Sequence, residues 1–177
     1  MTLILALALT LSMGVTVFAA DEKIEIDQDD TDKAGSTSVE YSVAPAYTVT
    51  IPPSVEINGD AVTVKAEGVK VNYNQQVAVR LTGVNVTDEL PEGDNSFNVK
   101  TAEGATLPYT VTADSTTAVS KGGTVLTVDP ANAEDNSGAN ESVNLTFALA
   151  QDQIIQYAGD YKGTVTFTVA VESKTAS

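Results

Sequence analysis

The stretch that decides the fold class is Tyr161-Lys162-Gly163-Thr164-Val165-Thr166-Phe167-Thr168-Val169-Ala170-Val171, near the end of the chain. Apolar side chains at positions 161, 165, 167, 169 and 171 alternate with polar ones at 162, 164, 166 and 168. A period of two residues is typical of a β-strand with one buried face. No other run places as many apolar side chains on one face. We therefore predict that this strand lies inside a sheet, paired on both sides, and fills the core of its own domain.

The same alternation recurs along most of the chain. It occurs at residues 39–43, 47–51, 55–57, 62–64, 77–81, 97–99, 107–111, 126–128 and 143–149. Pro52-Pro53 ends the second of these runs, because proline has no N–H to donate to a neighbouring strand. Asn58-Gly59 predicts a hairpin between the third and fourth runs, and Glu67-Gly68 predicts a turn.

These runs predict an all-β protein. Eight or nine short strands with polar outer faces bury their apolar sides when two sheets pack face to face or when a barrel closes. We predict an antiparallel β-sandwich of the immunoglobulin-like (Ig-like) kind over residues 39–177. No stretch after the first 20 residues keeps a helical spacing of apolar residues over eleven positions.

Composition excludes several kinds of chemistry. The 177 residues include 24 Asp and Glu against 9 Lys and Arg, for a net charge of -15, and there is no His, Cys or Trp. Without Cys and His, the chain has no zinc site of the usual type, no disulfide, and no nucleophile paired with His. Such an acidic surface repels phosphate backbones, so we expect no nucleic-acid partner.

The first 20 residues carry no charge and include a run rich in Leu and Ala. Val17 and Ala19 are the small residues that signal peptidase requires, so we predict a signal peptide at 1–19, although no Lys or Arg opens it. The alternative is a membrane helix, but Asp21 and Glu22 follow where a retained helix favours basic residues. We expect a secreted, extracellular protein, associated with the cell surface and with no membrane contact after cleavage. The lack of Cys favours a bacterial source.

Residues 20–38 are acidic and poor in apolar side chains, which predicts a flexible linker. Four acids, Asp27, Asp29, Asp30 and Asp32, raise the alternative of a calcium loop. A loop that starts at Asp27 places Asp32 where glycine is needed, and a loop that starts at Asp30 places Ala34 at a ligand position. We therefore predict no metal and no cofactor.

The remaining enzyme chemistries have little support. Paired carboxylates are uninformative among so many acids, and Ser115 and Ser120 lack a Lys three residues later. We expect no catalytic site. Glycan binding is a stronger alternative, for which Tyr73 and Tyr157, close to loops, are the possible contact residues. The other aromatic residues considered fall on apolar strand faces and are expected in the core: Tyr41, Tyr47, Tyr109, Phe147, Tyr161 and Phe167.

Self-association is a third possibility, because outer faces rich in Thr and unpaired strand edges favour added strands. A covalent cross-link between Lys65 and Asn144 was considered within this possibility, although both positions are expected on a polar outer face.

The C-terminal stretch 158–169 resembles the closing strand of secreted bacterial β-sandwiches, among them fimbrial-type subunits and the WxL wall-binding domains of Gram-positive bacteria. In WxL domains this run ends in Trp-x-Leu, whereas Phe167-Thr168-Val169 stands here. Residues 47–52 resemble the first strand of such proteins. The resemblance implies an envelope-associated sandwich. We expect a non-catalytic envelope or surface protein with a structural, adhesion or fibre-subunit role; its partners are itself or surface glycans. The alternative is a glycan- or cell-wall-binding module. No LPxTG-type sorting motif supports covalent attachment to the wall.

Overall fold

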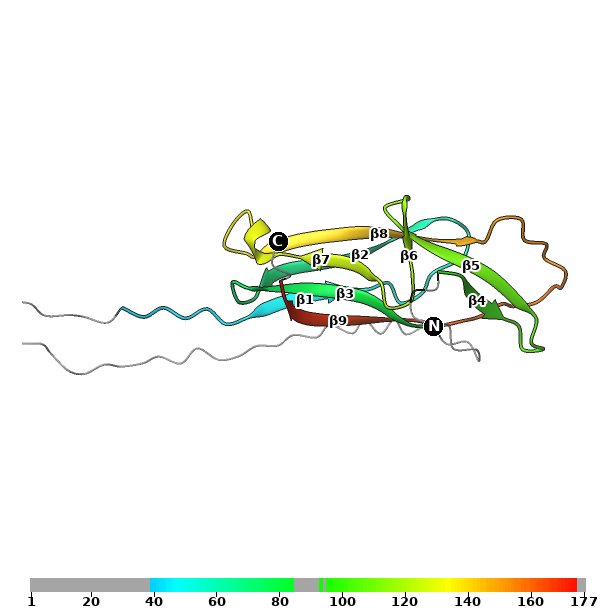
Figure 1. The fold of residues 1–177 in the computed structure, drawn as a ribbon, viewed down its shortest axis with the longest axis horizontal. Coiled ribbons are helices and arrows are strands. Elements are labelled where there is room, and N and C mark those ends of the chain that lie inside the picture. Colours follow the sequence, from blue (N-terminus) through cyan, green and yellow to red (C-terminus); the bar gives the residue numbers. More distant parts are fainter. Residues whose placement is uncertain (1–38, 85–92, 94, 175–177) are drawn as a thin grey trace, which may run out of the picture.

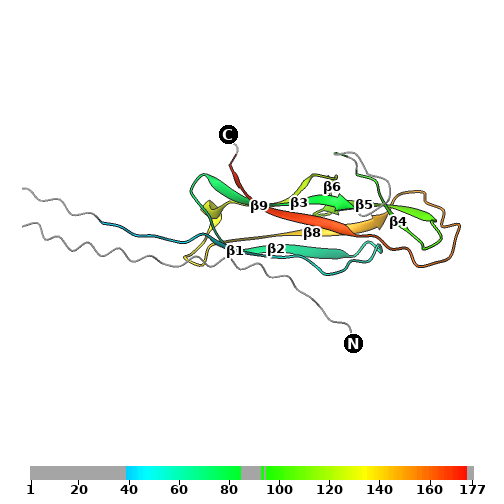
Figure 2. The same cartoon turned by 90° about the horizontal axis from the view of Figure 1, so that it is seen from below.

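The computed structural model describes residues 39–84, 93 and 95–174. In this part of the chain, nine strands form two antiparallel sheets, one of which curls into a half-barrel (Figures 1 and 2). The strands are β1 (Ala46–Thr50), β2 (Ala61–Lys70), β3 (Gln75–Val84), β4 (Phe97–Lys100), β5 (Thr106–Ala113), β6 (Thr117–Val119), β7 (Thr124–Val128), β8 (Ala139–Leu149) and β9 (Val165–Ser173). A short 3-10 helix, η1 (Pro130–Asn132), lies between β7 and β8. The prediction of an all-β protein with eight or nine strands is confirmed.

The larger sheet has the strand order β1-β2-β8-β5-β4, and β6 pairs with β5. The smaller sheet has the order β7-β3-β9. Strands distant in the sequence are neighbours in space: β2 pairs with β8, and β3 pairs with β9. The chain therefore crosses between the sheets repeatedly, and the apolar face of each sheet is covered by the other.

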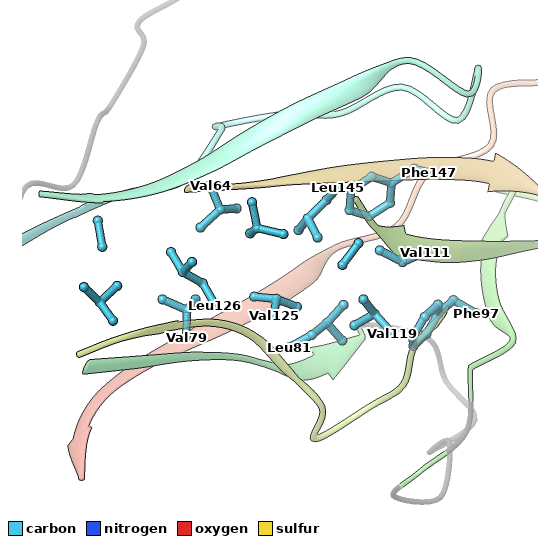
Figure 3. Close-up of a cluster of buried hydrophobic side chains, with 14 of the residues drawn as sticks. Val64, Val79, Leu81, Phe97, Val111, Val119, Val125, Leu126, Leu145 and Phe147 are labelled. Carbon is cyan, nitrogen blue, oxygen red and sulfur yellow. The ribbon is translucent and has the colours of Figure 1, made fainter. Parts of the chain in front are cut away.

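The core lies between the two sheets, as Figure 3 shows. Val64, Val111, Leu145 and Phe147 point inward from one side, and Val79, Leu81, Val125 and Leu126 point inward from the other. Each of these side chains is 8% exposed or less. Burial alternates along the strands as the sequence predicts. In β5, for example, every second residue from Leu107 to Ala113 is buried.

The strands predicted at 77–81, 97–99, 107–111, 126–128 and 143–149 are confirmed. Two other predicted strands are wrong. Residues 39–43 form no strand, and residues 55–57 belong to the long connection between β1 and β2. Asn58-Gly59 forms a turn in which Gly59 has a φ of 86°. The predicted hairpin between residues 55–57 and 62–64 is absent, because residues 55–57 form no strand and the partners of β2 are β1 and β8.

Glu67-Gly68 is a bulge within β2, and the predicted turn there is wrong. The register between β2 and β8 shifts between Ala66 and Val69, and Gly68 has a φ of 63°. The side-chain oxygen of Asn140 accepts a hydrogen bond from the Gly68 N–H at 2.9 Å, which satisfies the bulged backbone. Glycine marks turns and bulges alike because both require a positive φ.

The predicted position of the C-terminal strand is also wrong in part. Strand β9 begins at Val165, and it is an edge strand that pairs with β3 alone among the described strands. Its inward residues Val165, Phe167 and Val169 are half-buried and pack against the core. Before β9, Lys162 forms an isolated bridge with Lys100 of β4. The outer edge of β9 therefore faces a region that no described strand covers.

Candidate functional site

The two sheets leave an opening that we call the seam: the line between the outer edge of β9 and the edge formed by β1 and its continuation, residues 51–57. Both β1 and β9 end the strand order of their sheets, and they do not pair with each other. Figure 2 shows the two edges from the side on which they lie. Pro52 and Pro53 explain why β1 stops short, since neither residue has an N–H for a further ladder hydrogen bond.

A cavity of about 650 Å³ lies in the seam, and we call it the seam cavity. Its walls come from residues 52–57, from the start of β9, and from β4, β5 and β8. This volume falls within the roughly 300–1,000 Å³ that is usual for binding pockets. The seam cavity is therefore the best candidate for a functional site in the described part of the chain.

The apolar core forms the floor of the seam cavity. Val99, Leu107, Tyr109 and Phe147 line it and are all buried. The ring centres of Tyr109 and Phe147 lie 6.2 Å apart, and those of Phe97 and Tyr109 lie 5.6 Å apart. Burial raises the pKa of the Tyr109 phenol to about 12, so this group is neutral at physiological pH. The floor is buried, apolar and uncharged.

The rim of the seam cavity carries exposed apolar side chains. Leu149, at the end of β8, is 36% exposed, and Ile155, in the β8–β9 connection, is 57% exposed. Phe167 lines the cavity from β9 and is half-buried. Exposed apolar side chains grouped around a hollow are typical of an interaction site.

The position of the β9 edge depends on close packing before the strand begins. A β-carbon at Gly163 would lie 3.1 Å from the side chain of Val99, so a larger residue there would push the chain away from β4. Hydrogen bonds of 2.9 and 3.0 Å join the backbones of Lys100 and Lys162. Together these contacts fix one end of the seam and keep the cavity walls in place.

The charged side chains that line the seam cavity are Glu56 and Lys162, and both are exposed. They lie on opposite walls, one in the β1–β2 connection and one in front of β9. The apolar lining of the seam cavity can pack against apolar groups, and the backbone of the outer β9 edge can form hydrogen bonds with an added strand. Its chemistry is that of binding an extended or apolar partner.

The structure does not bring the two predicted glycan contacts together. Tyr73 lies in the β2–β3 turn and is 95% exposed, with the Lys174 ammonium 5.9 Å from its ring centre. Tyr157 lies in the β8–β9 connection and is 63% exposed, and its carbonyl accepts a hydrogen bond from the Tyr161 hydroxyl at 2.8 Å. Lys174, beside Tyr73, follows the end of β9, whereas Tyr161, beside Tyr157, precedes its start. The two tyrosines therefore do not form one platform.

The aromatic residues expected in the core divide into three groups. Tyr109 and Phe147 are buried, as predicted, whereas Tyr47, Tyr161 and Phe167 are half-buried. The prediction for Tyr41 is wrong, because this residue is 92% exposed.

Lys65 and Asn144 have other partners than each other. Lys65 forms an ion pair with Glu67 at 2.7 Å, and Asn144 accepts a hydrogen bond from Thr63 at 2.8 Å. Both residues lie on the polar face, where the sequence places them. These contacts give no support to a covalent cross-link between the two.

The predicted signal peptide at 1–19, the linker at 20–38 and the acids at 27, 29, 30 and 32 lie outside the described residues. Within residues 39–84, 93 and 95–174, no group of three acids could together hold a metal ion. Within the same ranges, no helix is long and apolar enough to cross a membrane.

The seam cavity was not predicted from the sequence. Two features could have pointed to it: the Pro52-Pro53 pair, which prevents β1 from continuing, and the apolar pair Ile154-Ile155 in an otherwise polar connection. The chain was compared with protein-family models and with curated proteins, and neither comparison finds a match. The site is therefore interpreted from its own geometry.

Proposed function

We propose that this chain is a non-catalytic, secreted protein of the bacterial cell envelope that acts as a structural, adhesion or fibre subunit. In this proposal, residues 1–19 are a signal peptide removed on export, residues 20–38 are an acidic linker, and the remainder is a sandwich of the Ig-like kind. The weak resemblance to WxL domains and fimbrial-type subunits agrees with such a role.

The observation that carries the proposal is the seam cavity beside the unpaired edge of β9. An exposed strand edge invites pairing with another chain, and an apolar hollow next to it receives alternate side chains of that chain. The described residues that line the hollow are mostly apolar, which suits binding better than catalysis. Assembly or adhesion through an added strand is the activity that this geometry supports best.

The test is to locate the protein in the cells that produce it. We expect surface biotinylation or protease treatment of intact cells to reach the protein, and intact-mass analysis to show an N-terminus at Ala20 or Asp21. Recovery of the full-length chain from the cytoplasm, protected from protease and with Met1 retained, would contradict the proposal.

Glycan binding is the second candidate, supported by the exposed rings of Tyr73 and Tyr157. Aromatic rings that stand free of the core can stack on sugars. Binding to purified cell wall should fall in the Tyr73→Ala or Tyr157→Ala variant if this candidate is correct. Unchanged binding in both variants would remove it.

A further inference from the structure

The floor of the seam cavity contains a polar group that has no protein partner. Among the described residues of the floor, Tyr109 alone has a polar side-chain group, since Val99, Leu107 and Phe147 are wholly apolar. The Tyr109 hydroxyl forms no hydrogen bond with another described residue, and burial alone accounts for the rise in its pKa. A phenol can both donate and accept hydrogen bonds, so this group has unused capacity.

The Tyr109 hydroxyl faces the cavity and is not sealed within the core. Tyr109 as a whole is 2% exposed. In the described part of the chain, however, every side-chain nitrogen or oxygen that is cut off from solvent in a residue that is not exposed has a hydrogen-bond partner. Because the Tyr109 oxygen has no such partner, it lies at an open surface, and the open surface that Tyr109 borders is the cavity. A polar atom in this position can bind and orient a molecule that enters.

The other hydroxyl groups among the described lining residues lie at the rim or are already engaged. The Tyr161 hydroxyl donates a hydrogen bond to the Tyr157 carbonyl at 2.8 Å. Ser54 and Thr164 line the cavity but are exposed to solvent. The Tyr109 hydroxyl is therefore the buried donor toward which a bound molecule would direct an acceptor.

Water is poorly held on this floor. A buried water normally forms about three hydrogen bonds, whereas a cavity with apolar walls holds water weakly or stays dry. The floor offers one hydroxyl, and Val55, Ile57, Val165 and Phe167 line the walls with apolar side chains. An apolar molecule that displaces such water gains free energy, and a single acceptor on it would satisfy the hydroxyl.

The charges around the cavity favour an uncharged molecule. Glu56 and Lys162 are the charged residues of the described lining, and both are exposed at the rim. Neither belongs to the floor, where an ionic group would lose its hydration without gaining a charged partner. The net charge of -15 also repels anions from the chain as a whole.

The volume of the cavity sets the size of the molecule. At about 30 Å³ for each water, a cavity of about 650 Å³ has space for roughly 20 water molecules. A molecule with a similar or somewhat smaller number of non-hydrogen atoms would fit. An alkyl chain of medium length or a ring with an alkyl substituent falls in this range.

We propose that the seam cavity binds a small, uncharged, apolar molecule with one hydrogen-bond acceptor, and that this acceptor receives a hydrogen bond from the Tyr109 hydroxyl. The chemical class is a hydrocarbon body that carries a single ketone, ester or ether oxygen. The inference goes beyond the envelope role proposed above and does not depend on it, because it concerns a ligand of the folded chain.

The first test measures binding of N-phenylnaphthylamine, an uncharged dye that fluoresces in apolar surroundings, to the purified chain beginning at Ala20. The absence of Trp keeps protein fluorescence from interfering. We expect saturable binding and displacement of the dye by hexanophenone, a ketone with an apolar body. Phenylhexanoate and phenylhexylammonium, which carry a charge on a comparable body, should displace it at least roughly tenfold less well. A dye that does not bind, or charged compounds that compete as well as hexanophenone, would overturn the inference.

The second test identifies the partner of the acceptor. Tyr109→Phe removes the hydroxyl and keeps the ring, so the thermal midpoint at neutral pH should be retained. We expect the affinity for hexanophenone to fall about two- to tenfold, the usual range for one neutral hydrogen bond. The affinity for hexylbenzene, which lacks the oxygen, should not fall. Equal changes for the two compounds would show that the hydroxyl does not contact the ligand, and the proposed contact would be refuted.

The third test locates the ligand without altering the floor. Ile155 lines the cavity and is 57% exposed, whereas Ile154 is 80% exposed and does not line it. Ile155→Glu should weaken binding of the dye and the ketone by at least roughly fourfold, the equivalent of one methylene group lost from apolar contact. Ile154→Glu is the matched control, because it adds the same charge one residue away, and both affinities should be retained. Equal weakening in the two variants, or none in either, would place the ligand elsewhere.

This inference and the proposed function can fail separately. A protein that is displayed on the cell surface but binds none of these compounds would disprove the ligand site and leave the envelope role in place. A protein that binds hexanophenone but is retained in the cytoplasm would disprove the envelope role and leave the ligand site in place.

Discussion

Two phenylalanines that line the seam cavity, Phe147 in its floor and Phe167 on β9, test whether this region is open. Phe147 is 1% exposed and lies 6.2 Å from the ring of Tyr109, so Phe147→Ala creates a new void inside the core. Replacing a buried Phe with Ala typically costs ~3–5 kcal/mol, a large part of a typical total stability of ~5–15 kcal/mol. We expect a loss in this range for Phe147→Ala.

Phe167→Ala should cost much less. Phe167 is half-buried and borders a cavity of about 650 Å³ that already exists. Its truncation widens an opening instead of creating an enclosed void, so the cavity contribution is small. Full burial of a Phe side chain contributes ~1.5–3 kcal/mol, and half of that gives an expected loss of ~0.8–1.5 kcal/mol.

The assay is urea unfolding followed by far-ultraviolet circular dichroism, since the chain has no Trp for fluorescence. The free energies of unfolding are comparable if the denaturant slope stays the same in all variants. Thr166→Ala is the control, because Thr166 is exposed on the same strand and its loss should change stability by less than ~0.5 kcal/mol. Equal losses for Phe147→Ala and Phe167→Ala would show that β9 packs in a closed core, and the argument for an open seam would be refuted.

Three further predictions concern single groups. Burial raises the pKa of Tyr109 from 10.0 to about 12, so the unfolded chain ionises at a lower pH than the folded one. The free energy of unfolding should therefore keep its full value below pH 10 and fall by ~3 kcal/mol as pH rises through 12, and Tyr109→Phe should abolish this part of the alkaline loss in pH-dependent urea titrations. Gly138→Ala should destabilise the protein by ~3 kcal/mol or more, because the new β-carbon would lie 2.6 Å from the backbone of the β2 bulge. Gly104 also has a positive φ, but no atom lies within 4 Å of the position of its β-carbon, so Gly104→Ala should cost only ~1–2 kcal/mol in the same assay. The hydrogen bond from Lys174 lowers the pKa of Asp129, and the hydrogen bond from Gln76 lowers the pKa of Glu172. The stability that each carboxylate contributes is therefore present above the ordinary pKa values of 3.8 and 4.5, and it is lost as pH falls through the lower pKa values of the folded state. The double variant Asp129→Asn, Glu172→Gln should lose less stability in acid than the wild type, and an unchanged acid profile would contradict the assignment.

The sequence predicts the fold class well because alternation depends on local geometry. Successive side chains of a strand point to opposite faces, so the buried residues of β5 and β8 can be identified from their spacing alone. The same spacing fails for residues 39–43. Val39, Tyr41 and Val43 alternate as well as any strand in the core, yet they are exposed because no described strand pairs with them. Alternation indicates a segment's preference for a strand but does not identify its partner.

The position of β9 could not be predicted for a related reason. The apolar content of residues 161–171 predicts a central strand, but β9 pairs with β3 alone among the described strands. Pairing depends on contacts between residues far apart in the chain, such as Val77 with Val171, and a single sequence carries no direct record of them. The half-buried state of Val165 and Phe167 reflects this edge position. The seam cavity was missed because it arises where two such unpaired edges meet.

The seam also raises the question of how the protein avoids indiscriminate association. Natural edge strands are usually protected by proline, charge or bulges. Residues 51–57 are protected in this way, because Pro52 and Pro53 cannot donate ladder hydrogen bonds. The edge of β9 has no proline, and the outward residues Thr166 and Thr168 at the cavity end of the strand are uncharged, whereas Glu172 near its other end pairs with Arg80. Residues 51–57 are therefore blocked, whereas the edge of β9 can still pair. This asymmetry would let one strand add to the seam, along β9. An apolar cavity beside the unprotected edge is better explained by a specific partner than by incomplete packing.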